Sequence, residues 1–266
     1  MYRYSHVMRC VQDIYDAIAV NGFTESMLKI INELITDIKN GTTDFSRLNQ
    51  QEHSGLCKAG SALIGASLIA CYASRSLSAS GDAPSSQGCP ANWQIDERQE
   101  QLIEQWAKAA HLWVESSDTV LRDGFGPMIA QGAEAKVYYR EGSPAVLKER
   151  ASIYSTTQKA LDAIVLHNCF FPETTMTVIG FTRDSDSLFR IILVQPYVRC
   201  LRLATKEEID MLVAPMGSRD NGDGNGVNYI SDRIALEDMH PANVFIDEVS
   251  ERPICINCII KFVAKR

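Results

Sequence analysis

The sequence predicts an α+β fold, in which a helical region precedes a domain of short antiparallel strands. In residues 1–40, apolar side chains recur at helical spacing, which predicts two helices closed by Asn-Gly pairs. From residue 128 onward, short segments alternate apolar and polar side chains and are separated by turns such as EGSP. With 266 residues, 45% of them hydrophobic, the chain can bury the core that such a domain needs.

Composition divides the chain into three regions. Residues 1–75 form the predicted helical accessory region, which ends with the apolar run SALIGASLIACYA at 61–73. That run has thirteen residues, whereas crossing a bilayer takes roughly 20, so we expect a buried helix there. Residues 76–94 are rich in Ser, Gly, Ala and Pro and are predicted to be a linker, and residues 95–266 are the predicted α+β domain.

Charge and cysteine usage limit the partners and the compartment. The 26 basic and 33 acidic residues give a net charge of −7, which argues against direct nucleic-acid binding or attraction to an anionic membrane. The first residues, MYRYSHVMRC, lack the pattern of a secretory signal, so we expect a cytoplasmic protein. Its eight cysteines are then expected to be reduced thiols.

The predicted domain begins with a helix and continues with strands. Asp96 is predicted to cap a helix whose apolar side carries Ile103, Trp106 and Trp113. MIAQGAEAKVYYR and PAVLKER then predict strands, TTQKALDAIVLHNCFF a helix, and TMTVIGFT and LFRIILVQPYV two further strands. The glycine-rich stretch at 217–228 is expected to be a flexible connection.

The polar residues on these elements follow the order of parts in a kinase. Backbone near Gly132, in the first turn, can approach phosphates closely because glycine has no side chain. Lys148 can neutralise phosphates that are not transferred, provided that Asp162 on the following helix holds its ammonium group.

The run DMHPAN supplies the predicted reaction centre. Asp238 would orient and deprotonate an attacking hydroxyl, and Asn243 would offer its side-chain oxygen to a magnesium ion. We expect NVFID and PICINCI to pair through the turn EVSER, which places Asn257 on the second strand and beside this loop as the second metal ligand. A carboxylate would suit that position better than an amide, because Mg²⁺ prefers anionic oxygen.

Cys255 and Cys258 form a C-x-x-C pair within the second of these strands. Side chains alternate along a strand, so the two thiols are expected on opposite faces, and metal or redox chemistry is not expected there.

From about residue 95 to 266 the chain resembles the kinase domain of polyvalent proteins carried by phages and mobile elements. The resemblance lies in QGAEAKVYY, LHN, FPET, VIGFTRDSD, QPYV and ALEDMHPANVFID, and DMHPAN also resembles the loop of aminoglycoside and choline phosphotransferases. It implies a kinase-like amino lobe of antiparallel strands with a reduced carboxy lobe, and ATP and Mg²⁺ as cofactors. The residues expected at the site are catalytic Asp238, nucleotide-binding Gly132, Lys148, Asp162 and Gln195, and metal-binding Asn243 and Asn257.

Three functions are compatible with these residues. The first is an ATP-dependent phosphotransferase with an unknown phosphate acceptor, such as a host protein, weakened by the amide of Asn257. The second is a pseudokinase that binds nucleotide and works through protein contacts, and the third is a structural packaged protein that binds no nucleotide. Only nine residues follow Asn257, so we expect no activation segment or helical peptide-binding lobe of the protein-kinase type.

Overall fold

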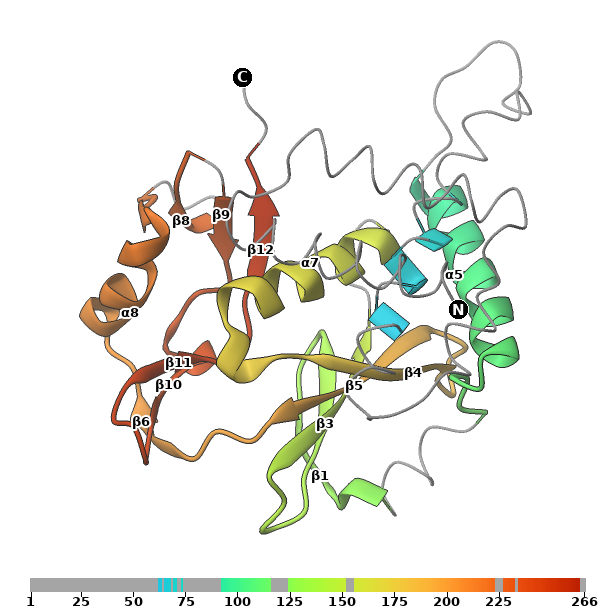
Figure 1. The fold of residues 1–266 in the computed structure, drawn as a ribbon, viewed down its shortest axis with the longest axis horizontal. Coiled ribbons are helices and arrows are strands. Elements are labelled where there is room, and N and C mark those ends of the chain that lie inside the picture. The colour runs from blue at the N-terminus through green and yellow to red at the C-terminus, as the bar shows by residue number, and fades with distance from the viewer. Residues whose placement is uncertain are drawn as a thin grey trace, which may run out of the picture. The chain divides into compact units, whose positions relative to one another are not determined.

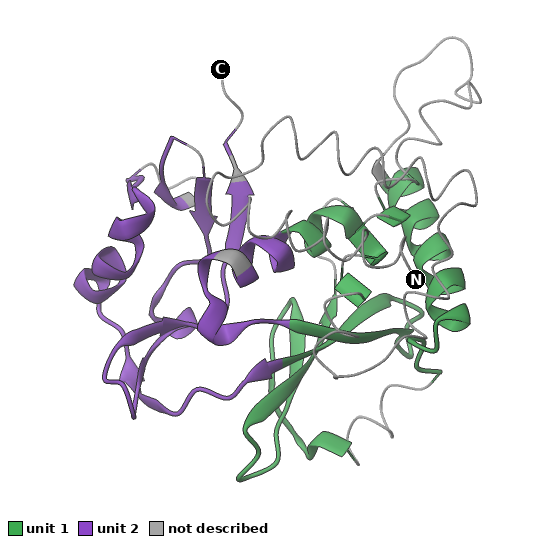
Figure 2. Ribbon diagram, viewed as in Figure 1, with its two compact units in different colours: residues 1–162, 177–194 green, residues 163–176, 195–266 purple. Residues whose placement is uncertain are grey.

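A computed structural model describes the chain at residues 62–63, 65–67, 69–70, 73, 92–115, 124–151, 156–222, 227–232 and 234–263. The helices predicted within residues 1–40 lie outside these ranges. The chain forms two compact units, unit 1 with Met1–Asp162 and Thr177–Val194 and unit 2 with Ala163–Met176 and Gln195–Arg266 (Figure 2). In the described part of the chain, none of the helices has both the length and the apolarity that crossing a membrane requires.

Unit 1 is built on the antiparallel strands that the alternating segments predict. Its five-stranded sheet has the order β1-β2-β3-β5-β4 (Figure 1). Tyr138, Leu147 and Ile192 form a buried core cluster on neighbouring strands. The strands are β1 Met128–Gln131, β2 Ala135–Tyr138, β3 Ala145–Ala151, β4 Thr177–Arg183 and β5 Phe189–Pro196.

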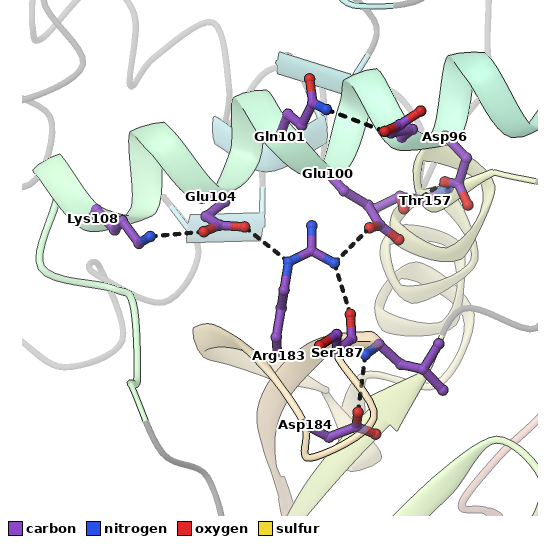
Figure 3. Close-up of polar contacts among 11 residues, drawn as sticks. Asp96, Glu100, Gln101, Glu104, Lys108, Thr157, Arg183, Asp184 and Ser187 are labelled. Atoms are coloured by element: carbon purple, nitrogen blue, oxygen red, sulfur yellow. Dashed lines mark hydrogen bonds and ion pairs between the residues drawn. The ribbon is translucent and has the colours of Figure 1, made fainter.

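Helix α5, Asn92–Ala109, is anchored to this sheet by Arg183 of β4. The guanidinium of Arg183 lies 2.9 Å from Glu104 and 3.1 Å from Glu100 and also donates to the carbonyl of Ser187 (Figure 3). Residues 62–73, where described, are helical and, apart from the half-buried Ser67, buried, as predicted. A side chain at Gly65 would lie 2.7 Å from the Trp106 ring, so only glycine fits at this contact.

Asp96 caps a different helix from the one predicted. Helix α5 begins at Asn92, so Asp96 lies within its first turns. Its Oδ1 instead accepts hydrogen bonds from the backbone N–H and the hydroxyl of Thr157, the first residue of α7 (Thr157–Phe170), the latter at 2.7 Å. Gln99 adds a second cap by accepting from the N–H of Gln158 at 2.9 Å. The prediction was wrong because the free N–H groups that a cap satisfies can belong to another helix.

Unit 2 contains two smaller antiparallel sheets, with orders β11-β10-β6 and β12-β9-β8-β7. The strands are β6 Cys200–Leu203, β7 Arg219–Asp220, β8 Val227–Ile230, β9 Ile234–Glu237, β10 Val244–Asp247, β11 Pro253–Cys255 and β12 Ile259–Phe262. The 3₁₀ turns are η1 Pro172–Thr174, η2 Ala214–Met216 and η3 Pro241–Asn243, and α8 is Lys206–Val213. The stretch 217–228, expected to be a connection, holds the paired β7 and the start of β8.

The two units together confirm the predicted α+β fold and its antiparallel amino part. The predicted hairpin is also confirmed, because Val244 of β10 pairs with Cys255 of β11 and Phe245 with Ile254. Its turn is closed by Asp247, whose carboxylate accepts from both the N–H and the hydroxyl of Ser250 at 2.8 Å.

Candidate active site

The loop that carries Asp238 lies between β9 and η3 and has an unusual backbone. Asp238 has a φ of +61°, a left-handed conformation that Asp tolerates better than most residues. The loop then closes through a hydrogen bond of 2.8 Å from the N–H of Asn243 to the carbonyl of His240. Asp238 and His240 keep 41% and 46% of their side-chain surface exposed, so both can contact a substrate.

Asn243 fixes the carboxylate of Asp238. Its side-chain NH₂ group donates to the Asp238 carbonyl at 2.9 Å and to Asp238 Oδ2 at 2.8 Å. Because both donated bonds go to one residue, the carboxylate is held relative to its own backbone. Asn243 Oδ1 has no hydrogen-bond partner within the described ranges, which leaves it available as a metal ligand.

His240 orients the other oxygen of the same carboxylate. Its Nδ1 accepts from the N–H of Ala242 at 3.2 Å, so the neutral ring carries its proton on Nε2. Nε2 lies 2.9 Å from Asp238 Oδ1 and donates to it. Asp238 therefore receives one hydrogen bond on each carboxylate oxygen.

Asn257 lies in the connection between β11 and β12, two residues beyond the strand on which the sequence placed it. The N–H of Ile256 donates to the carbonyl of Asn243 at 2.9 Å, which brings the backbone before Asn257 next to the Asp238 loop, as expected. The carbonyl of Asn257 accepts from the thiol of Cys255 at 3.3 Å. Within the described ranges its side-chain amide has no hydrogen-bond partner.

Gln195 holds the same connection in place. Its side-chain NH₂ group is buried and donates to the carbonyls of Thr174 at 2.8 Å and Ile256 at 3.1 Å. These two bonds tie η1 to the residue before Asn257. The structure thus shows a positioning contact for Gln195, while its predicted contact with nucleotide stays a prediction.

The predicted nucleotide-binding residues Gly132 and Lys148 both lie in unit 1. Gly132 is in the turn between β1 and β2, and a side chain there would meet open space. The turn is fastened to β3, because Glu134 pairs with the guanidinium of Arg150 and the Glu134 carbonyl accepts from the N–H of Ala151 at 2.8 Å. Lys148, on β3, is only 9% exposed, so it is not the solvated edge residue that a strand lysine often is.

Asp162, the predicted partner of Lys148, lies partly buried on α7. Burial raises the pKa of its carboxyl to about 7. No cation is bonded to it within the described ranges. Its role as the holder of Lys148 therefore stays a prediction.

Unit 2 contains a group of sulfur and nitrogen atoms that was not predicted from the sequence. His167, Cys255 and Cys258 are buried, and their ligand atoms all lie within 4.8 Å of one another. The prediction that the two thiols lie on opposite faces was wrong, because β11 ends at Cys255 and strand alternation does not continue to Cys258. The C-x-x-C spacing, together with the histidine in LHN, was the signal that could have revealed this group.

The sheet with a buried lysine on its third strand, the helix after it, and the DMHPAN loop followed by a hairpin define the chain as a kinase-like protein. Residues 96–264 match the family described as Serine/Threonine/Tyrosine Kinase found in polyvalent proteins, and the chain belongs to that family. This confirms the resemblance seen in the sequence. Among curated proteins, no relative matches this chain.

Proposed function

We propose that this kinase-like protein is an ATP-dependent phosphotransferase in which Asp238 is the catalytic base. The observation that carries the proposal is the fixed carboxylate of Asp238, with Oδ1 bonded to His240 and Oδ2 to Asn243. A base must be presented in one orientation to accept a hydroxyl proton as phosphoryl transfer begins. An exposed aspartate in an ordinary turn would not need two side chains to hold it.

The metal-binding residues in this proposal are Asn243 and Asn257. Asn243 Oδ1 and the amide of Asn257 belong to segments joined by the Ile256–Asn243 backbone bond, and neither has another partner in the described part of the chain. The donor set matches the preference of Mg²⁺ for oxygen but lacks the carboxylate that would add charge. When bound, Mg²⁺ would neutralise phosphate charge.

In unit 1, Lys148 would neutralise phosphates and Gly132 would let backbone approach them, with Asp162 orienting Lys148. Gln195, which belongs to unit 2, is the remaining residue that we propose for nucleotide binding. The burial of Lys148 and the open space at Gly132 support the first two roles. We further propose a host protein as phosphate acceptor, a cytoplasmic location and a mobile-element origin, in keeping with a family found in polyvalent proteins.

A pseudokinase that binds nucleotide without transferring phosphate is the second candidate, and Asn257 favours it. An amide preserves the shape of a metal ligand but has no charge, so nucleotide can bind while turnover is slow. A thermal-shift titration with ATP, with and without Mg²⁺, separates both candidates from a structural protein, which would show no shift.

Asn257→Asp separates the two remaining candidates. For a phosphotransferase weakened by Asn257, the added carboxylate should raise Mg²⁺-dependent ATP consumption by about tenfold or more, a gain of at least ~1.4 kcal/mol in transition-state stabilisation. Asp238→Ala in that background should abolish the gain. Asn221→Asp, which makes the same chemical change outside this loop, is the matched control. Unchanged binding and turnover in Asn257→Asp would remove residue 257 from the metal site.

A further inference from the structure

Beyond the nucleotide site, unit 2 contains a second set of residues able to bind a ligand. His167 and Cys255 are 0% exposed and Cys258 is 1% exposed. They come from the second half of α7, the end of β11 and the connection to β12, which all belong to the purple unit in Figure 2. Nδ1 of His167 lies 3.8 Å from Sγ of Cys258.

The histidine is already oriented as a ligand. Its Nε2 lies 3.2 Å from the carbonyl of Thr174, and a carbonyl can only accept, so Nε2 carries the proton. Nδ1 is therefore the unprotonated nitrogen, and it faces Sγ of Cys258. Metal-bound histidines are typically held in this way, with the second ring nitrogen donating to a backbone carbonyl.

Neighbouring contacts hold this arrangement. The Thr174 hydroxyl donates to the carbonyl of Cys255 at 2.7 Å, and Gln195 donates to the carbonyl of Thr174 at 2.8 Å. The same threonine thus orients the histidine ring and the backbone of one cysteine. A hydrophobic core packed only from apolar side chains would not need these hydrogen bonds to Thr174 and Cys255.

The geometry points to a binding site for one thiophilic d¹⁰ metal ion, Zn²⁺ or Cu⁺, held by His167 Nδ1 and the sulfur atoms of Cys255 and Cys258. In a tetrahedral zinc site, Zn–S and Zn–N bonds of about 2.3 and 2.0 Å place sulfur and nitrogen ligands about 3.5 Å apart. The observed 3.8 Å between Nδ1 and Cys258 Sγ needs only a small contraction.

The donor types select the ion. Two thiols and an imidazole are soft or borderline ligands, which bind zinc or copper rather than magnesium or calcium. Each thiol gives its proton to solvent on binding, so two thiolates and Zn²⁺ form a neutral group that suits a buried position. Sδ of Met239 lies 3.7 Å from Sγ of Cys255 and can complete the ligand set, a thioether contact that favours Cu⁺.

The position of the site gives it a structural consequence. Cys255 and Cys258 flank Asn257, and Met239 directly follows Asp238. A bound ion would therefore fix the connection that carries Asn257 against the Asp238 loop. This consequence for the reaction depends on the function proposed above, whereas metal binding itself is measured without nucleotide.

The experiment uses the full chain, reduced and stripped with a chelator. Zn²⁺, Co²⁺ and Cu⁺ are added separately, and bound metal is counted by mass spectrometry after gel filtration. We expect one equivalent of Zn²⁺ or Cu⁺ per chain, and with Co²⁺ a thiolate charge-transfer absorption. Whichever of Zn²⁺ and Cu⁺ remains bound in competition identifies the ion. Binding of neither ion would overturn the inference.

Two variants locate the ion. Cys258→Ser keeps the size of the side chain and should lower metal affinity at least tenfold and abolish the Co²⁺ charge-transfer band. Cys200→Ser, at an exposed cysteine outside the group, should bind as the wild type does. His167→Gln should weaken Co²⁺ binding and shift its d–d absorption. Equal metal retention by wild type and a folded Cys258→Ser variant would overturn the inference, because the ion would then lie elsewhere.

Discussion

Charged side chains are buried on strand β3 of unit 1 but exposed in the Asp238 loop of unit 2. Lys148, Glu149 and Arg150 follow one another on β3, and each is at most 9% exposed. In the loop, Asp238 and His240 keep nearly half of their side-chain surface in solvent. The strand therefore buries its charged groups, whereas the loop orients a charged group that stays exposed.

This difference separates charged groups that stabilise the fold from charged groups that can take part in a reaction. Arg150 is paired with Glu134, and Glu149 accepts from the Tyr138 hydroxyl at 3.2 Å, while its Oε1 has no hydrogen-bond partner among the residues that the structure describes. Burying a charged group costs free energy unless an opposite charge or hydrogen bonds compensate it. Removing a partner of such a group therefore lowers the stability of the folded protein. Asp238 can meet a substrate because its orienting bonds leave it exposed.

Removing Arg150 gives the largest effect that the comparison predicts. Arg150→Ala leaves the carboxylate of Glu134, whose side chain is 13% exposed, without its cation, and should lower the free energy of unfolding by about 3–5 kcal/mol. Urea denaturation measures this. Arg202→Ala breaks an exposed ion pair with Glu208 and should change stability little. A small loss in Arg150→Ala, equal to that in Arg202→Ala, would contradict the structural role of the strand charges.

The partly buried carboxyl of Asp162 should make the stability of the protein depend on pH. Its folded-state pKa of about 7 lies above the ordinary value of 3.8, so the folded protein binds the proton more tightly. The stability that Asp162 contributes is therefore fully present below about pH 4 and is lost as pH rises to about 7. Between pH 5 and pH 8 we expect a loss of roughly 2–3 kcal/mol that Asp162→Asn does not show, measured by urea denaturation at both values.

The control is Asp186→Asn, which changes an exposed aspartate of unit 1 and should retain the wild-type pH dependence. The same experiment sharpens the role predicted for Asp162. If the carboxylate pairs with Lys148, its pKa falls. The wild type and Asp162→Asn will then show the same change in stability between pH 5 and pH 8.

The sequence predicted best what local chemistry determines. The hairpin of Val244 with Cys255 follows from two apolar segments separated by a short polar turn, and its register is set within a dozen residues. Asp238 and Asn243 could be recognised for the same reason, because five residues separate them and one turn brings them into contact.

Contacts between distant segments could not be predicted in this way. Asp96 caps a helix 61 residues further along the chain, and nothing in its own neighbourhood indicates which N–H groups it will meet. The convergence of Cys255 and Cys258 depends on β11 ending at Cys255, so that the chain is no longer extended up to Cys258. A rule of strand alternation fails at the residue where the strand stops.

Lys148 tests whether a charged group on β3 can bind a ligand as well as stabilise the fold. Lys148→Met keeps much of the buried stem and removes the ammonium, and should weaken ATP binding about tenfold, or ~1.4 kcal/mol, without unfolding the protein. Lys136→Met removes a neighbouring ammonium on β2, 4.0 Å from Glu149, and should bind ATP as the wild type does. Isothermal titration measures both. Wild-type affinity in a folded Lys148→Met variant would assign Lys148 to structure alone.

The helix caps Thr205, in unit 2, and Asp96, in unit 1, should have the smallest effect on stability. They compare a cap within one helix with a cap between two helices. Thr205 caps α8 locally, with a hydroxyl that accepts from the N–H of Glu208 at 3.3 Å and an N–H that donates back to the Glu208 carboxylate at 2.8 Å. Thr205→Ala should therefore cost about 1 kcal/mol and speed hydrogen exchange only in the first turn of α8. Asp96→Ala should cost a similar amount, but because this residue belongs to α5 and caps α7, exchange should quicken at the starts of two helices. Mass spectrometry of exchanged peptides distinguishes the patterns. If Asp96→Ala affects α5 alone, the contact with Thr157 does not stabilise α7, and the cap is as local as that of α8.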